Sequence, residues 1–99
     1  MPDTYRVIIS PKALSELESI LDYIALDSPA NAVKVIDHLL EEIASLETFP
    51  GRYAEVETDD PDAAHIRLMP SPPFRIFYQL LKEQKVVRVM AVEHGARQR

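Results

Sequence analysis

The chain has 99 residues, of which 46% are apolar and 27% charged, which is typical of an ordinary soluble globular domain with a single core. It contains no cysteine and only three widely spaced histidines, so disulfides and thiolate sites are excluded and we expect no metal and no cofactor. No long apolar run indicates a membrane span, and the first ten residues lack the features of a signal peptide, so we expect a cytoplasmic protein without a membrane partner.

The net charge of −5 is unevenly distributed along the chain. Residues 1–50 carry three cations and nine anions, whereas residues 64–99 carry seven cations and two anions. One interpretation is a pair of solvated helix faces followed by an ordinary sheet. The other is a basic surface on an acidic body, suited to an anionic partner. The sequence pI of about 5.1 disfavours a protein that grips nucleic acid unaided.

The first half of the chain predicts one strand and two helices. Tyr5–Ile9 is rich in β-branched residues and predicts a strand. Ser10-Pro11 and Asp27-Ser28-Pro29 each provide a helix N-cap followed by proline at the first helical position. The first helix has apolar residues at helical spacing over roughly four turns, and Pro50-Gly51 ends the second helix. The short connection predicts an antiparallel hairpin.

The second half predicts strands. Tyr53–Glu57 is a candidate short strand, Ala64–Met69 a further strand, and Pro70–Pro73 a stiff connector. Two apolar runs, Phe74–Leu81 and Lys85–Val92, follow and are joined by the polar residues Lys82-Glu83-Gln84.

Alternation along the last two runs assigns their side chains to two faces. One face is apolar and is expected to meet the helices: Phe74, Ile76, Tyr78, Leu80, Val87, Val89 and Ala91. The other mixes cations with apolar side chains, which suits a partner surface: Arg75, Phe77, Gln79, Leu81, Val86, Arg88, Met90, Val92 and His94.

These elements predict one α+β domain over residues 1–99, in the order β-α-α-β-β-β. An N-terminal strand precedes an antiparallel two-helix hairpin, which packs on one face of a mostly antiparallel sheet of four or five strands. The arginine-bearing reverse of the sheet is expected to stay uncovered. This interpretation requires Arg67, Arg75 and Arg97 to lie on that same side.

The chain resembles the RelE/ParE superfamily of type II toxins over nearly its whole length. The resemblance rests on the segments SPKALSELESILDYIA, LEEIASLETFPGR, IRLMPSPPFRIFY and VEHGAR in this order and spacing. It implies either a ribosome-dependent endoribonuclease that cuts messenger RNA, as in RelE-like members, or an inhibitor of DNA gyrase, as in ParE-like members.

The resemblance also implies partners. A cognate antitoxin, usually encoded beside the toxin, would neutralise it in a hetero-oligomer, and a homodimer through the helical hairpin is possible. We predict that the antitoxin docks on the open sheet face through Arg75, Phe77, Arg88 and Met90. A fold-holding ion pair is the alternative role for Arg75.

For the ribonuclease, the resemblance places phosphate-binding arginines at Arg67 and Arg97, with His94 as a candidate acid or base. The alternative for His94 is a hydrogen bond at a strand end.

Two departures from the pattern of RelE-like ribonucleases favour a ParE-like toxin, which is not an enzyme. The stretch YAEVETDDPD is acidic where RelE-like ribonucleases tend to be rich in lysine, and only two residues follow Arg97, where such enzymes can carry a further catalytic tyrosine. The ribonuclease and an inactive toxin-fold binding module remain alternatives.

Overall fold

The computed structural model describes residues 4–95 and has the predicted order of elements. These are β1 (Arg6–Ile9), α1 (Pro11–Ala25), α2 (Pro29–Ala44), β2 (Ile66–Ser71), β3 (Phe74–Leu81) and β4 (Val86–His94). Short 3-10 turns occupy Ser45–Glu47, Pro50–Arg52 and Pro61–Ala63. The α+β class is therefore confirmed. Within residues 4–95, no helix has the length and apolar character needed to cross a bilayer.

Both helices begin where their sequences predict. The Ser10 hydroxyl accepts a hydrogen bond from the Ala13 amide at 3.1 Å, and the Ser28 hydroxyl accepts one from the Asn31 amide at 3.2 Å. Each satisfies an amide that the first helical turn leaves without a partner. Ser10 also donates to the Met90 carbonyl of β4 at 3.3 Å, so this cap ties α1 to the sheet.

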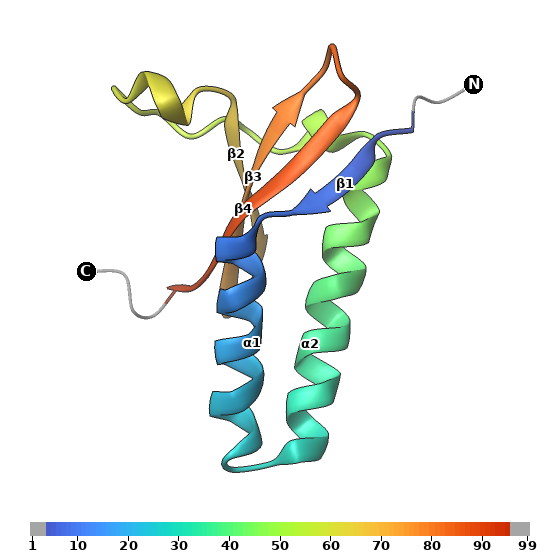
Figure 1. Ribbon diagram of the computed structural model, residues 1–99, viewed down its shortest axis with the longest axis vertical. Helices are drawn as coiled ribbons and strands as arrows, with labels where there is room; N and C mark the ends of the chain where they lie inside the picture. The colour runs from blue at the N-terminus through green and yellow to red at the C-terminus, as the bar shows by residue number, and fades with distance from the viewer. Residues whose placement is uncertain (1–3, 96–99) are drawn as a thin grey trace.

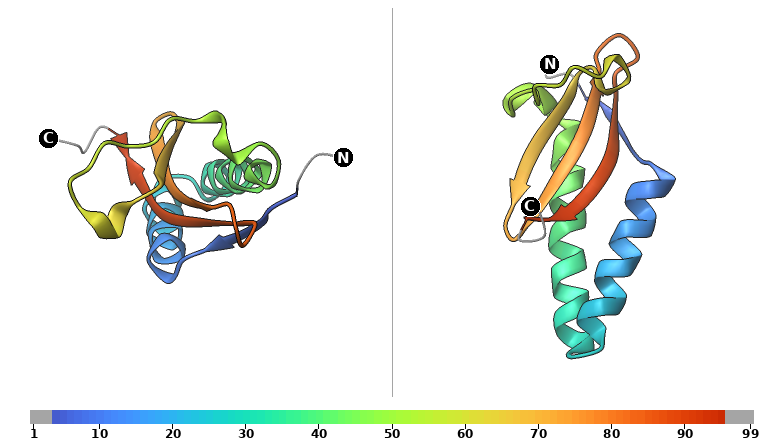
Figure 2. Two further views of the ribbon diagram at one scale, coloured as in Figure 1. Left: turned by 90° about the horizontal axis from the view of Figure 1, so that it is seen from above. Right: turned by 90° about the vertical axis from the view of Figure 1, so that its left-hand side faces the viewer.

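The two helices form an antiparallel hairpin whose turn extends beyond the end of the sheet (Figure 1). One face of the sheet packs against the hairpin, and α2 runs behind the strands in the right-hand view of Figure 2. Side chains from both layers form one buried cluster, in which apolar residues of the helices meet those of the strands: Ala13, Leu17, Leu39, Ile43, Met69, Ile76, Tyr78, Val87 and Val89.

The sheet has four strands in the order β1-β4-β3-β2 and is mixed. β1 pairs with β4 in parallel, while β3 is antiparallel to both of its neighbours. The helical hairpin carries the chain across one face of the sheet, from β1 at one edge to β2 at the other, and β2 therefore runs in the same direction as β1. The mostly antiparallel sheet predicted from the sequence is confirmed.

The strands differ from the sequence prediction most clearly in the segment Tyr53–Glu57 and at the end of β2. Within Tyr53–Glu57 only Glu55 forms a bridge, to Arg67 in β2. β2 continues through Pro70 to Ser71, where a connector was expected. Proline is tolerated there because β2 is the last strand of the sheet, so its missing N–H interrupts no ladder.

A bulge in β4 reassigns side chains that the sequence placed on the open face. Tyr78 is paired with Val89, but Phe77 is paired with Ala91, so Met90 is an extra residue in β4. One extra residue reverses the alternation of everything that follows. The sequence assignment of Val92 and His94 to the open face, and of Ala91 to the apolar face, is therefore wrong.

The dual role of Ser10 leads to a test of how the first helix is fixed. We expect Ser10→Ala to lower the free energy of unfolding by about 2 kcal/mol, since it removes both a helix cap and a hydrogen bond to β4. Ser28→Ala removes only a cap and should cost about 1 kcal/mol. Urea unfolding of the two variants measures the difference, and equal losses would contradict a link between Ser10 and the sheet.

Candidate functional site

The sheet face turned away from the helices carries rows of side chains that cross the strands. Register and alternation define these rows, which are Ile8–Arg88–Gln79–Ile66, Ala91–Phe77–Leu68 and Glu93–Arg75–Pro70. We call these residues, together with Arg6 and Met90, the open sheet face. Its apolar members are mostly half-buried, as expected for a sheet surface without a covering layer.

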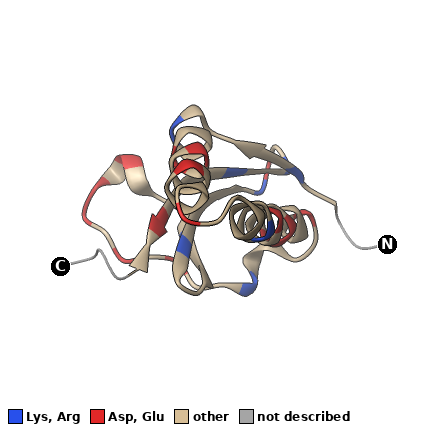
Figure 3. Ribbon diagram, turned by 90° about the horizontal axis from the view of Figure 1, so that it is seen from below, with Lys and Arg blue, Asp and Glu red and all other residues tan. Residues whose placement is uncertain are grey.

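Three arginines give the open sheet face a positive character. Arg6 and Arg88 are exposed, and Arg75 is half-buried. The Arg75 guanidinium lies 3.8 Å from the Glu93 carboxylate and 5.8 Å from the centre of the Phe77 ring. In contrast, acidic residues are carried by both helices and by the loop that precedes β2 (Figure 3). The molecule therefore presents surfaces of opposite charge.

Arg67 lies on the other face of the sheet, and the expectation that it would share the open side with Arg75 is wrong. It is opposite Tyr78, a core residue. Its guanidinium donates hydrogen bonds to the carbonyls of Gly51 at 3.3 Å and Tyr53 at 2.5 Å, and lies 3.5 Å from the Glu55 carboxylate. Its side chain is only 14% exposed.

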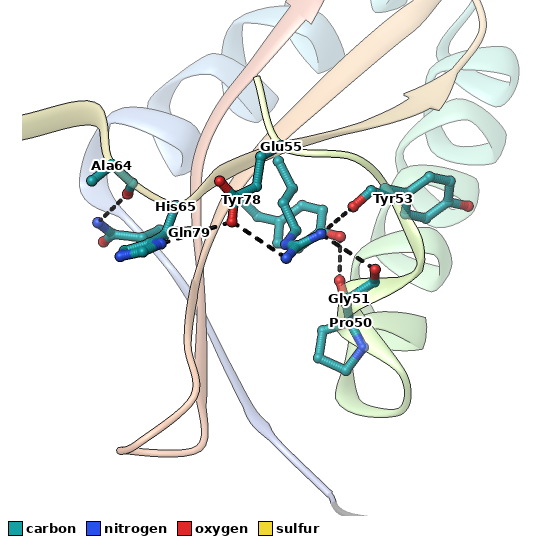
Figure 4. A network of polar contacts seen from close by, with 9 residues as sticks. Pro50, Gly51, Tyr53, Glu55, Ala64, His65, Tyr78 and Gln79 are labelled. Atoms are coloured by element: carbon teal, nitrogen blue, oxygen red, sulfur yellow. Dashed lines mark hydrogen bonds and ion pairs between the residues drawn. The ribbon is translucent and has the colours of Figure 1, made fainter. Parts of the chain in front are cut away.

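Tyr78, which is opposite Arg67 in the sheet, also binds the loop of residues 50–55. Its buried hydroxyl donates to the Pro50 carbonyl (Figure 4). Burial raises the pKa of this hydroxyl above its ordinary value, so it stays protonated and can donate at neutral pH. Arg67 and Tyr78 together hold residues 50–55 against the sheet.

His94 also lies on the helix-covered side, because of the bulge. It is opposite Phe74, and the two rings make an edge contact with centroids 5.2 Å apart. Arg67 is opposite Tyr78, four residues farther along β3, which corresponds to about 13 Å along a strand. The structure therefore does not bring His94 and Arg67 together, and Arg97 lies outside the described residues.

Two features of the open sheet face were not found from the sequence. Arg6 and Ile8 join it because β1 pairs in parallel with β4, while their neighbours Val7 and Ile9 pack against the core. The alternation within β1 could have indicated which of its residues share a face, but not which strand it joins. The partner-binding roles of Arg75, Phe77, Arg88 and Met90 stay predictions.

The sequence profile of one protein family matches this chain. That family is described as the ParE toxin of the type II toxin-antitoxin system parDE, and the match covers residues 7–99. A search of curated protein sequences finds no match.

Solved structures share the fold, and three of them are described here by their similarity to this chain. A chromosomal ParDE system of P. aeruginosa has a TM-score of 0.74 at 19% identity, with 93% of this chain and 97% of that chain covered. The RelBE2 toxin-antitoxin complex of Mycobacterium tuberculosis has a TM-score of 0.63 at 16% identity, covering 92% and 98%. A free mutant of the E. coli toxin RelE has a TM-score of 0.64 at 19% identity, covering 93% and 84%.

A matched pair of arginine variants tests the position of Arg67. We expect Arg67→Met to lower the free energy of unfolding by about 2 kcal/mol, because carbonyls of the 50–55 loop lose a charged donor. Arg88→Met, on the exposed face, should change it by less than about 0.5 kcal/mol. Urea unfolding measures the stability of both variants. An Arg67 variant as stable as the Arg88 variant would contradict the attachment of the 50–55 loop by Arg67.

Proposed function

Because this chain belongs to the family of ParE toxins of type II toxin-antitoxin systems, we propose that it arrests growth by inhibiting DNA gyrase and not by cutting messenger RNA. The observation that carries this choice is the position of Arg67, whose guanidinium is engaged with the 50–55 loop and lies far along the sheet from His94.

Cleavage of RNA would require the candidate catalytic residues to lie around one phosphate. A base must activate the 2′-hydroxyl, cations must stabilise the growing phosphate charge, and an acid must protonate the leaving oxygen. Arg67 could bind a phosphate only if its guanidinium gave up the hydrogen bonds to the carbonyls of Gly51 and Tyr53. The acidic loop before β2 would also repel an RNA backbone.

The second part of the proposal is neutralisation by a cognate antitoxin that docks on the open sheet face. Its support is a half-buried apolar row, Ala91–Phe77–Leu68, flanked by Arg75 and Arg88 on a face that the helices leave uncovered. An extended acidic segment with apolar residues at alternate positions would complement this surface in shape and charge. Two of the structures with this fold are described as toxin-antitoxin systems of the ParDE and RelBE types.

The activity is tested by inducing the protein with and without the antitoxin encoded beside it. We expect growth arrest only without the antitoxin, loss of supercoiling when purified gyrase is incubated with the protein, and full-length transcripts in mapped RNA. Cut transcripts together with normal supercoiling would instead support the ribonuclease. Normal growth with retained antitoxin binding would support an inactive binding module.

The affinity of the purified toxin for the antitoxin tests the docking surface. Arg88→Glu reverses a charge at the centre of the open sheet face and should weaken antitoxin binding about tenfold. Lys82→Glu makes the same change in the exposed β3–β4 turn and serves as the control. Equal affinities for the two variants would place the antitoxin elsewhere on the toxin.

A further inference from the structure

Phe49 holds an aromatic ring in solvent, in the turn between the 3-10 segments Ser45–Glu47 and Pro50–Arg52. The residue is 73% exposed, and its backbone has φ 50° and ψ 51°, the left-handed helical conformation. This conformation is unfavourable for a bulky residue, because its Cβ approaches the following carbonyl oxygen, whereas glycine and asparagine adopt it far more readily. The turn accounts for the backbone conformation, but a ring that lies mostly in solvent contributes little to the fold.

Hydrogen bonds fix the backbone on both sides of the ring. On one side the Arg52 guanidinium donates to the carbonyls of Thr48 at 2.8 Å and Phe49 at 3.1 Å. On the other side Pro50 is buried, and its carbonyl accepts a hydrogen bond from the Tyr78 hydroxyl (Figure 4). Such bracing keeps a strained residue in place. The ring is thus presented on a rigid support, so little conformational freedom is lost when a partner buries it.

The neighbours of Phe49 have the composition of a binding hot spot. Tyr53 is half-buried, and the Arg52 guanidinium lies over its ring, 5.1 Å from the ring centre. Tyr5 is attached to the same segment, because its amide donates to the Glu47 carbonyl at 2.8 Å. Aromatic and arginine side chains are enriched at the centres of protein interfaces. We call Tyr5, Phe49, Arg52 and Tyr53 the aromatic corner.

The charges at the aromatic corner favour a protein partner over a nucleic acid. Exposed rings also stack on bases, but such sites combine them with cations that follow the phosphate backbone. Arg52 is engaged with backbone carbonyls of its own loop, and Glu47 is an exposed anion on the same segment. An apolar pocket on a protein therefore complements this corner better than a row of phosphates does.

The aromatic corner is separate from the open sheet face. Its loop is attached to the sheet by Arg67 and Tyr78, which lie on the opposite face. A protein that buries Phe49 therefore contacts a different part of the toxin from the antitoxin that we place on the open sheet face.

We infer that the aromatic corner is the surface through which this toxin binds gyrase, with the Phe49 ring inserted into an apolar pocket of the enzyme. The inference rests on the proposed function, which needs a contact surface for gyrase. In this arrangement the antitoxin neutralises the toxin by obstructing its approach to the enzyme and leaves Phe49 uncovered.

Phe49→Asn tests the anchor, because it removes the ring and keeps a residue that tolerates the left-handed backbone. We expect it to weaken binding to purified gyrase about thirtyfold, as for a hot-spot residue, and to raise the concentration needed to inhibit supercoiling by a similar factor. Its affinity for the antitoxin should be unchanged, and its urea midpoint should be equal to that of the parent or higher.

Leu26→Asn is the matched control. Leu26 is 87% exposed and precedes α2, whereas Phe49 follows it, so the two side chains lie beyond opposite ends of this helix. This variant should inhibit supercoiling like the parent. Arg52→Met tests the support of the ring and should weaken binding to gyrase without changing the affinity for the antitoxin. An equal loss of both affinities would contradict a specific role of Arg52 in presenting Phe49.

The remaining outcomes also decide the question. Equal inhibition by Phe49→Asn and the parent would overturn this inference and leave the proposed function intact. A parent protein that does not bind gyrase would overturn the proposed function and this inference with it. A lower urea midpoint in Phe49→Asn would show that the ring supports the fold and contradict its role as an exposed anchor.

Two further results would assign the aromatic corner to another partner and overturn gyrase as its occupant. One is a loss of antitoxin affinity in Phe49→Asn. The other is a free toxin that is dimeric and that Phe49→Asn makes monomeric without any change in gyrase inhibition.

Discussion

The extra residue Met90 in β4 determines what each face of the sheet presents. Before it, Val87 and Val89 point to the helices; after it, Val92 takes that position. The shift places Ala91 beside Phe77 and Glu93 beside Arg75 on the open sheet face, and it turns His94 to the helix-covered side. A regular strand would have put two bulky side chains, Met90 and Val92, on the open face beside Phe77 and Arg75. The apolar row and the ion pair both follow from one inserted residue.

The second constraint is the attachment of residues 50–55 to the sheet. Arg67 and Tyr78 are neighbours across β2 and β3, and both donate hydrogen bonds to backbone carbonyls of this loop. A guanidinium used in this way has little capacity left for a phosphate, because Nη1 donates to two carbonyls of the loop and Nη2 faces the Glu55 carboxylate. Arg6 and Arg88 are exposed on the open sheet face, and Arg52, which is also exposed, donates to the Thr48 carbonyl at the end of the second helix's following turn.

The sequence predicts the helices and strands well, but it assigns the side chains to the two faces of the sheet only partly correctly. Both helix starts follow from Ser-Pro pairs, whose capping is a local effect, and β3 shows unbroken alternation. The bulge could not be foreseen, since it depends on how β4 matches β3, and Val92 is equally acceptable on either face by composition. The position of Arg67 was misjudged because its acceptors are carbonyls of a loop distant in sequence, which carry no sequence signal.

The bulge in β4 determines which side chains lie on each face of the sheet. Nuclear Overhauser contacts in the free toxin measure this directly. We expect contacts between the ring protons of His94 and Phe74, and between the methyl groups of Val92 and Ile76, because these pairs are opposite each other after the bulge. Contacts from Val92 to Arg75 instead, with Met90 opposite Phe77, would show a regular strand and contradict the open sheet face as defined by the bulge.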